Sequence, residues 1–168
     1  KTQKERCTVN SREIVMRTIR FQGAERFPYM LDSAHGTDFA WCGMDPSPDW
    51  RPRSGVDEWG CVWERTALAN MGQVKGHPLE EWSLEPSYRW PDPDDEGYYA
   101  GMEERFAGSE GKYVTTGMFM LLFERMHSLR GMQNVLTELY TDRARMEYLA
   151  DRIVDFDVRV ITNIGHRF

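Results

Sequence analysis

The stretch KYVTTGMFMLLFERMHSLRG, residues 112–131, decides the fold class of this chain. Its first five residues are rich in β-branched and aromatic side chains, which favour a strand, and Gly117 indicates the turn that follows. Apolar residues then recur at helical spacing up to Gly131, namely Phe119, Leu122, Phe123, Met126 and Leu129. A strand that leads into an amphipathic helix predicts a parallel α/β architecture.

Two more helices are predicted downstream of Gly131. The first is short and contains Val135, Leu136, Leu139 and Tyr140. The second carries an apolar stripe, begins after Thr141 or Asp142 and ends at Gly165. Its stripe recurs every three or four residues and consists of Leu149, Ile153, Phe156, Val160 and Ile164. Both patterns predict helices that bury one face.

Upstream, a capped helix is predicted to precede the first strand. Asn10 and Glu13 have the spacing of a capping box, so a helix begins at about Ser11, and Gly23 stops it. The nearly continuous apolar run at 26–31 predicts a short, buried parallel strand, with Pro28 at its start or edge.

The middle of the chain predicts an inserted hairpin between two proline-rich loops, 44–52 and 86–95. Residues 56–63 alternate as a strand, with Gly60 as a bulge, and a weaker antiparallel strand is predicted at 70–75. Three residues of the first strand share one face, namely Trp59, Cys61 and Trp63. A helix is predicted from about Glu96 to Phe106.

Composition excludes several classes of partner. The 27 acidic residues against 21 basic ones give a net charge of -6 without a basic stripe, which argues against nucleic acid. No apolar stretch reaches the roughly 20 residues of a membrane span, and residues 1–7 lack the apolar core of a signal peptide, so a cytoplasmic protein is expected. The three cysteines form no CxxC pair and the four histidines are scattered, so no metal site is predicted from this chain alone.

Several motifs, in order along the chain, resemble the N-terminal half of uroporphyrinogen-decarboxylase-like proteins. The resemblance covers nearly the whole chain, is densest at 119–131, and runs through 10–13, 23–28, 56–63, 78–80, 88–94, 119–131 and 149–153. It implies a (β/α)8 barrel with its active site at the carboxyl ends of the strands. We therefore expect residues 1–168 to form the N-terminal portion of a TIM-type barrel with a β-hairpin insertion.

The resemblance implies two chemistries. Family members either decarboxylate the acetate arms of a tetrapyrrole without a cofactor, or move methyl groups between a corrinoid protein and an acceptor such as a thiol, with zinc held in the C-terminal half. The decarboxylases carry an Arg-Gln-Ala-Gly-Arg signature where this chain has FQGAER at 21–26, and their tyrosine falls at Glu124. A corrinoid-linked methyltransferase or an uncharacterised relative is the first expectation. A tetrapyrrole decarboxylase and a non-catalytic binding or assembly barrel are the alternatives.

Two groups of polar residues are candidate substrate-binding residues. Asp57, Glu58 and Trp59 could form a pocket lip in which the indole stacks on a flat ligand, although a core indole with two solvated acids is the plainer interpretation. The second group follows the predicted first strand, where barrel sites lie, but could also be ordinary loop; its members are Asp32, His35 and Asp38.

The second strand and its helix supply the remaining candidates. Met118 and Phe119 follow the strand, although barrel packing explains them equally. Glu124 and His127 have the Glu-x-x-His spacing of a di-iron ligand pair, but that site needs a second copy and two more glutamates. We interpret the pair as a pocket rim or a solvated helix face.

The expected barrel needs more residues and more strands than this sequence supplies. Such barrels take about 250 residues, and only two parallel strands are predicted. We therefore expect a fragment that is covered by the remaining half of its barrel, a complementary chain or a second subunit. A corrinoid protein and a small-molecule substrate are the further expected partners, and corrinoid and zinc are the expected cofactors of the complete protein, with none bound by this half alone.

Overall fold

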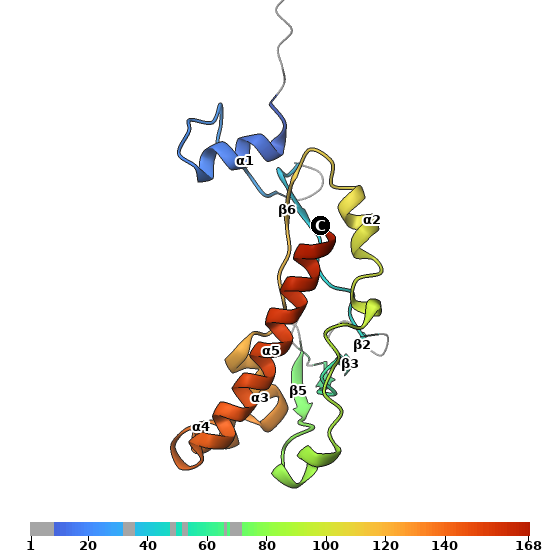
Figure 1. Ribbon diagram of the computed structural model, residues 1–168, viewed down its shortest axis with the longest axis vertical. Coiled ribbons are helices and arrows are strands. Elements are labelled where there is room, and N and C mark those ends of the chain that lie inside the picture. The colour runs from blue at the N-terminus through green and yellow to red at the C-terminus, as the bar shows by residue number, and fades with distance from the viewer. Residues whose placement is uncertain (1–8, 32–35, 48–49, 52–53, 66, 68–71) are drawn as a thin grey trace, which may run out of the picture. The chain divides into compact units, whose positions relative to one another are not determined.

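The computed structural model describes residues 9–31, 36–47, 50–51, 54–65, 67 and 72–168 (Figure 1). These residues form a mixed α/β protein with two small sheets, neither of which closes on itself. The chain divides into two compact units. Unit 1 comprises Lys1–Met44 and Ala100–Gly117, and unit 2 comprises Asp45–Tyr99 and Met118–Phe168. The mixed α/β character of the prediction is therefore confirmed, and the barrel stays a prediction.

Unit 1 contains a parallel strand pair. β1 (Phe39–Trp41) pairs with β6 (Tyr113–Thr115), with Phe39 opposite Tyr113. The unit also contains α1 (Ser11–Ile19) and α2 (Met102–Ala107). The Asn10 side chain accepts the Glu13 N–H at 2.9 Å, so the predicted helix start is confirmed. The strand predicted at 112–116 is confirmed as β6.

The strand predicted at 26–31 is wrong. Only Met30 forms a bridge there, with Thr37, and the strand of this region is β1, about ten residues later. The Tyr29 N–H and the Arg26 guanidinium both bind the Asp38 carboxylate, which folds the apolar run back as a loop. An apolar run does not specify a pairing partner, and here a buried acid captured the backbone donor that a strand would use.

Unit 2 contains an antiparallel sheet with strands in sequence order: β2 (Trp50–Arg51), β3 (Ser54–Val56), β4 (Val62–Glu64) and β5 (Gln73–Gly76). The pairing of β4 with β5 confirms the predicted hairpin; residues 70 and 71 lie outside the described residues. The predicted single strand 56–63 is wrong, because a turn divides it into β3 and β4. Gly60 belongs to that turn, at φ 75°, and is not a bulge.

Three helices complete unit 2: α3 (Leu122–Arg130), α4 (Met132–Thr141) and α5 (Arg143–Arg167). They confirm the helices predicted around Gly131, but the predicted end at Gly165 is wrong, because α5 continues to Arg167. α3 begins three residues later than the apolar pattern suggested, because Met120 has φ 60°. The five stripe residues of α5 are all buried, and Phe156 packs edge-on against Trp59 with ring centroids 4.7 Å apart. The helix predicted over 96–106 is interrupted, forming the 3-10 turn η2 (Glu96–Tyr98) and then α2.

Four arginines of α5 contact the segment 82–99, which includes the 3-10 helix η1 (Trp82–Ser87). We call this row of arginines the arginine ladder. The guanidinium carbon of Arg145 lies 5.4 Å from the Trp82 ring centroid, and that of Arg152 lies 4.6 Å from the Trp90 centroid. Further along, Arg159 pairs with Asp94, and Arg167 stacks on Tyr99 at 4.5 Å. With 3.6 residues per turn, the four arginines lie within roughly 80° of one another around the helix axis, so one side of α5 carries the whole arginine ladder.

Candidate functional site: a buried acid–arginine cluster

The most polar buried feature of unit 2 is the carboxylate of Asp57. One oxygen accepts the backbone N–H groups of Trp59 at 3.0 Å and Cys61 at 2.9 Å. The other accepts the Trp63 indole N–H at 3.0 Å and Nη1 of Arg125 at 2.8 Å. Asp57 therefore closes the β3–β4 turn and at the same time fixes a buried arginine from α3.

Arg125 connects this turn to the start of α3. Its Nη2 donates to Glu58 Oε1 at 3.3 Å and to the backbone oxygen of Phe119 at 3.4 Å. Its guanidinium carbon lies 5.0 Å from the Trp59 ring centroid. The Arg125 side chain is 2% exposed, and its Nε is buried without a partner in the described structure. Four sequence-predicted candidates, Asp57, Glu58, Trp59 and Phe119, thus meet at one guanidinium.

The loop between β6 and α3 is held in a strained conformation. Met120 adopts φ 60°, which costs free energy for a residue with a side chain. Arg125 anchors the preceding carbonyl, and the Phe119 ring packs on Trp63 with centroids 5.9 Å apart while remaining 55% exposed. Met118 is half-buried in the same loop. Because the loop follows a parallel strand, it occupies the chain position where α/β proteins place ligand-binding residues.

Burial raises the pKa of two acids near Arg125, Glu58 and Asp157. The pKa of Glu58 is raised by burial, with Arg125 opposing the shift and Asp57 adding to it. Burial also raises the pKa of Asp157 on α5 to about 6, again against the attraction of Arg125. Burial and the nearby Glu58 charge raise the pKa of Tyr98. A raised carboxyl pKa is a property that a general acid or base can use, and Glu58 and Asp157 both have it.

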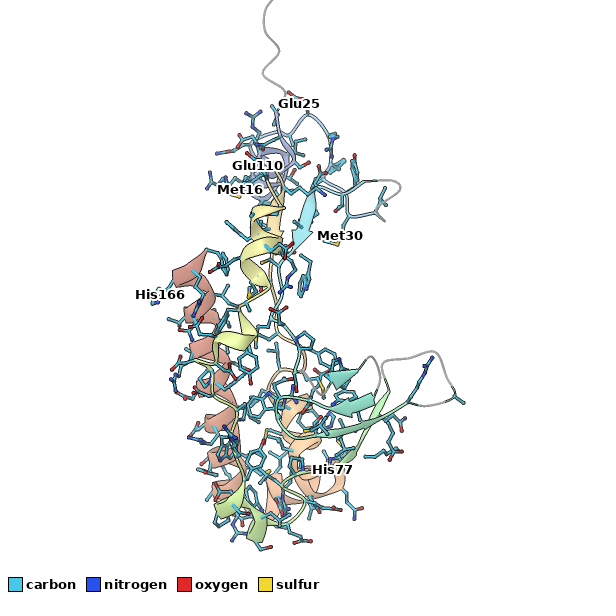
Figure 2. All side chains as sticks on the ribbon, turned by 90° about the vertical axis from the view of Figure 1, so that its right-hand side faces the viewer. Met16, Glu25, Met30, His77, Glu110 and His166 are labelled. Carbon is cyan, nitrogen blue, oxygen red and sulfur yellow. The ribbon has the colours of Figure 1, made fainter. Side chains whose placement is uncertain are left out.

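The Glu-x-x-His pair on α3 does not join this cluster. Glu124 is exposed, whereas His127 is half-buried and has a pKa lowered by burial. His77, labelled in Figure 2, lies against the same helix, and its Nδ1–H donates to the Ser128 carbonyl at 2.8 Å. A carbonyl only accepts, so the bond places the proton of neutral His77 on Nδ1. Among the described residues, no three His, Cys, Asp or Glu side chains form a metal-binding group.

Of the three candidates predicted after the first strand, Asp38 is the one that the structure describes. Asp32 and His35 lie outside the described residues. Asp38 belongs to unit 1, where Arg26 donates two bonds of 2.6 Å to its carboxylate. These hydrogen bonds hold the pKa of Asp38 well below its usual range. Asp38 is thus committed to a structural clasp with Arg26.

Three members of the cluster were not predicted: Arg125, Tyr98 and Asp157. For Arg125 a signal exists, because it lies three residues after Leu122 and four before Leu129, on the apolar stripe of its helix. A charge on the buried stripe requires a buried partner. Tyr98 and Asp157 carry no comparable signal.

No protein-family model, curated protein or solved structure matches this chain. Within the described ranges, no helix has both the length and the apolar character that crossing a membrane requires.

Proposed function

We propose that this chain is the N-terminal part of a uroporphyrinogen-decarboxylase-like (β/α)8 barrel that acts as a corrinoid-linked methyltransferase or a close relative. The observation that carries the proposal is the segment that follows β6 along the chain, where Arg125 gathers Asp57, Glu58 and Phe119. The order of elements supports it as well, because an inserted antiparallel hairpin lies between two strands that pair in parallel. A parallel pair needs such a long crossover.

Arg26 supports the preference for methyl transfer over decarboxylation. The decarboxylases that this chain resembles hold substrate carboxylates with paired arginines near the first strand. Here the only arginine of that stretch, Arg26, already donates two hydrogen bonds to Asp38 and also stacks on Tyr29 at 4.5 Å. Both Nη atoms of the Arg26 guanidinium therefore already bind a carboxylate of this chain. Glu124, exposed where the decarboxylases have tyrosine, would repel a polycarboxylate substrate.

The proposal assigns Glu58 and Phe119 to the substrate side of the cluster. Glu58 is only half-buried, and the Phe119 ring is more than half exposed, so both are accessible to a small molecule. Asp57 and Arg125 are inaccessible and hold these two in place. The zinc and corrinoid of the proposed reaction would come from other parts of the complete protein and from a corrinoid protein partner.

The proposal also requires more strands than the described residues supply. β1 and β6 form only a two-stranded sheet, and parallel sheets are normally covered on both faces. Large apolar side chains of unit 1 are exposed, with Phe21 at 96% and Phe27 at 87%. We assign the covering surface to the remaining half of the barrel or to a second subunit.

The test incubates the complete protein with methylcobalamin and thiol acceptors, and separately with uroporphyrinogen, while cobalamin absorbance and product mass are followed. Demethylation of the cobalamin is expected, and Glu58→Gln should lower it at least about tenfold if Glu58 touches substrate. The matched control is Glu64→Gln, an exposed acid on β4, which should leave the rate unchanged.

Three results would contradict the proposal. Loss of carboxyl groups from uroporphyrinogen without a cobalamin change would favour the decarboxylase, and no turnover in either assay would favour the non-catalytic binding barrel. Equal rates for Glu58→Gln and Glu64→Gln would remove Glu58 from the substrate side.

A further inference from the structure

A half-open groove of about 250 Å³ runs beside α5 in unit 2, apart from the Arg125 cluster's loop. One wall is Trp90, Pro91 and Pro93, and the other is the α5 face that carries Arg152, Phe156 and Arg159. This volume lies just below the roughly 300–1,000 Å³ of pockets for drug-sized ligands, so the groove fits a single-ring molecule.

The aromatic wall is rigidly positioned. The Trp90 ring packs edge-on against Tyr88 at 4.9 Å, and against Trp59 and Tyr148 at 6.4 Å each. Trp90 is itself half-buried and therefore keeps part of its surface open to the groove. Such a wall loses little conformational freedom when a flat apolar ligand packs against it.

Of the two arginines that line the groove, one has a carboxylate partner among the described residues and the other does not. Arg159 pairs with Asp94 and lies 3.9 Å from an oxygen of Asp155. The Asp92 carboxylate accepts the backbone N–H of Asp94 at 3.0 Å, so it is engaged in its own turn. Arg152 stacks on Trp90 at 4.6 Å and forms no ion pair with a carboxylate of the described residues. Asp92 and Asp155 also line the groove, so its acids and arginines balance in number, and Arg152 is the arginine whose guanidinium they leave without an ion pair.

We propose that this groove binds a small planar anion, a single aromatic ring that carries one carboxylate. The ring packs against Trp90 and the two prolines, and the carboxylate accepts the guanidinium N–H groups of Arg152. A guanidinium suits this role because its planar fork matches a carboxylate in two-point geometry while its face stays on the indole. Trp59 lines the groove and also lies under Arg125, so the groove and the acid–arginine cluster share this one indole. Benzoate binding is measured without turnover, so its outcome is independent of the methyl-transfer proposal.

Isothermal titration of the whole protein with benzoate tests the site, with benzamide as a neutral ligand of the same shape. We expect one saturable benzoate site with a dissociation constant on the order of 1 mM. Benzamide should bind at least about tenfold more weakly, and Arg152→Gln should weaken benzoate binding by a similar factor. The matched control is Arg143→Gln on the same helix, whose guanidinium pairs only with Glu147 among the described residues and should not affect binding.

A thermal melt of each variant shows whether it remains folded. If Arg152→Gln is unfolded, Arg152→Lys, which keeps the charge, replaces it and should retain weakened benzoate binding. Equal affinities for benzoate and benzamide would overturn the proposal. Unchanged benzoate binding by Arg152→Gln, or the absence of any saturable heat with the folded wild-type protein, would do so as well.

Discussion

Two aspartates, one in each unit, each bind an arginine and at least one backbone N–H, but they differ in how much water reaches the arginine. Asp38 in unit 1 binds Arg26, whose side chain is 39% exposed. Asp57 in unit 2 binds Arg125, whose side chain is 2% exposed. Asp38 itself is only 2% exposed, so water that replaces Arg26 must enter from the exposed arginine side, whereas at the second pair both side chains are buried. The same contact therefore acts as a replaceable clasp in unit 1 and as an obligatory core element in unit 2.

The largest expected effect is that of removing the buried charge. Arg125→Met leaves Asp57 buried without its counter-ion, beside Glu58, and should destabilise unit 2 by about 3–5 kcal/mol. Amide hydrogen exchange at Cys61 and Trp59, whose N–H groups bind Asp57, measures this locally. A loss below about 1 kcal/mol would show that water reaches the cluster.

The corresponding substitution in unit 1, Arg26→Met, should lower the free energy of unfolding at most about half as much. Arg26→Met removes the clasp, but water can solvate Asp38 in its place; exchange of the Tyr29 N–H reports the loss. Because the pKa of Asp38 is lowered in the folded state, the contribution is complete above its ordinary pKa of about 3.9 and is lost as pH falls further. An effect as large as that of Arg125→Met would abolish the contrast between the two units.

Replacing Asp157 should have the opposite effect on the free energy of unfolding, because this variant should be more stable than the wild type. Its pKa of about 6 lies above the ordinary value, so the wild type loses stability as pH rises from about 4 through 6, where the folded protein must release the proton. Asp157→Asn removes that cost and should stabilise unit 2 by about 1 kcal/mol at pH 8, after allowance for partial exposure, and by nothing below pH about 4. Urea unfolding at both pH values checks this. A destabilised variant at pH 8 would be inconsistent with burial as the cause.

The smallest effect is expected for an ion pair that is fully in water. Arg143 and Glu147 on α5 are 83% and 59% exposed, and their attraction is screened. Arg143→Ala should leave the urea midpoint unchanged within error. A measurable loss would show that exposure alone does not rank the three arginines.

Local patterns in the chain predicted most of the elements near the cluster. The Asn10 cap, the β-branched run at β6 and the apolar stripe of α5 each depend on neighbours a few residues apart, and all three are confirmed. The candidates Asp57, Glu58, Trp59 and Phe119 were also found from sequence, because acids and aromatic residues near strand ends are conspicuous. Their meeting at Arg125 involves partners up to 68 residues apart, which no local pattern encodes.

The amino-acid sequence by itself determined the mixed α/β class, the starts of α1 and α5 and the hairpin, because backbone propensity, capping and periodicity act over short distances. The tertiary structure alone decided that residues 26–31 form a loop and that 56–63 turn at Asp57. In both places a carboxylate binds backbone N–H groups that a strand would otherwise use, and an arginine from another part of the chain stabilises that carboxylate. Whether a buried acid finds such a partner depends on long-range packing, and that choice overrode the local strand patterns.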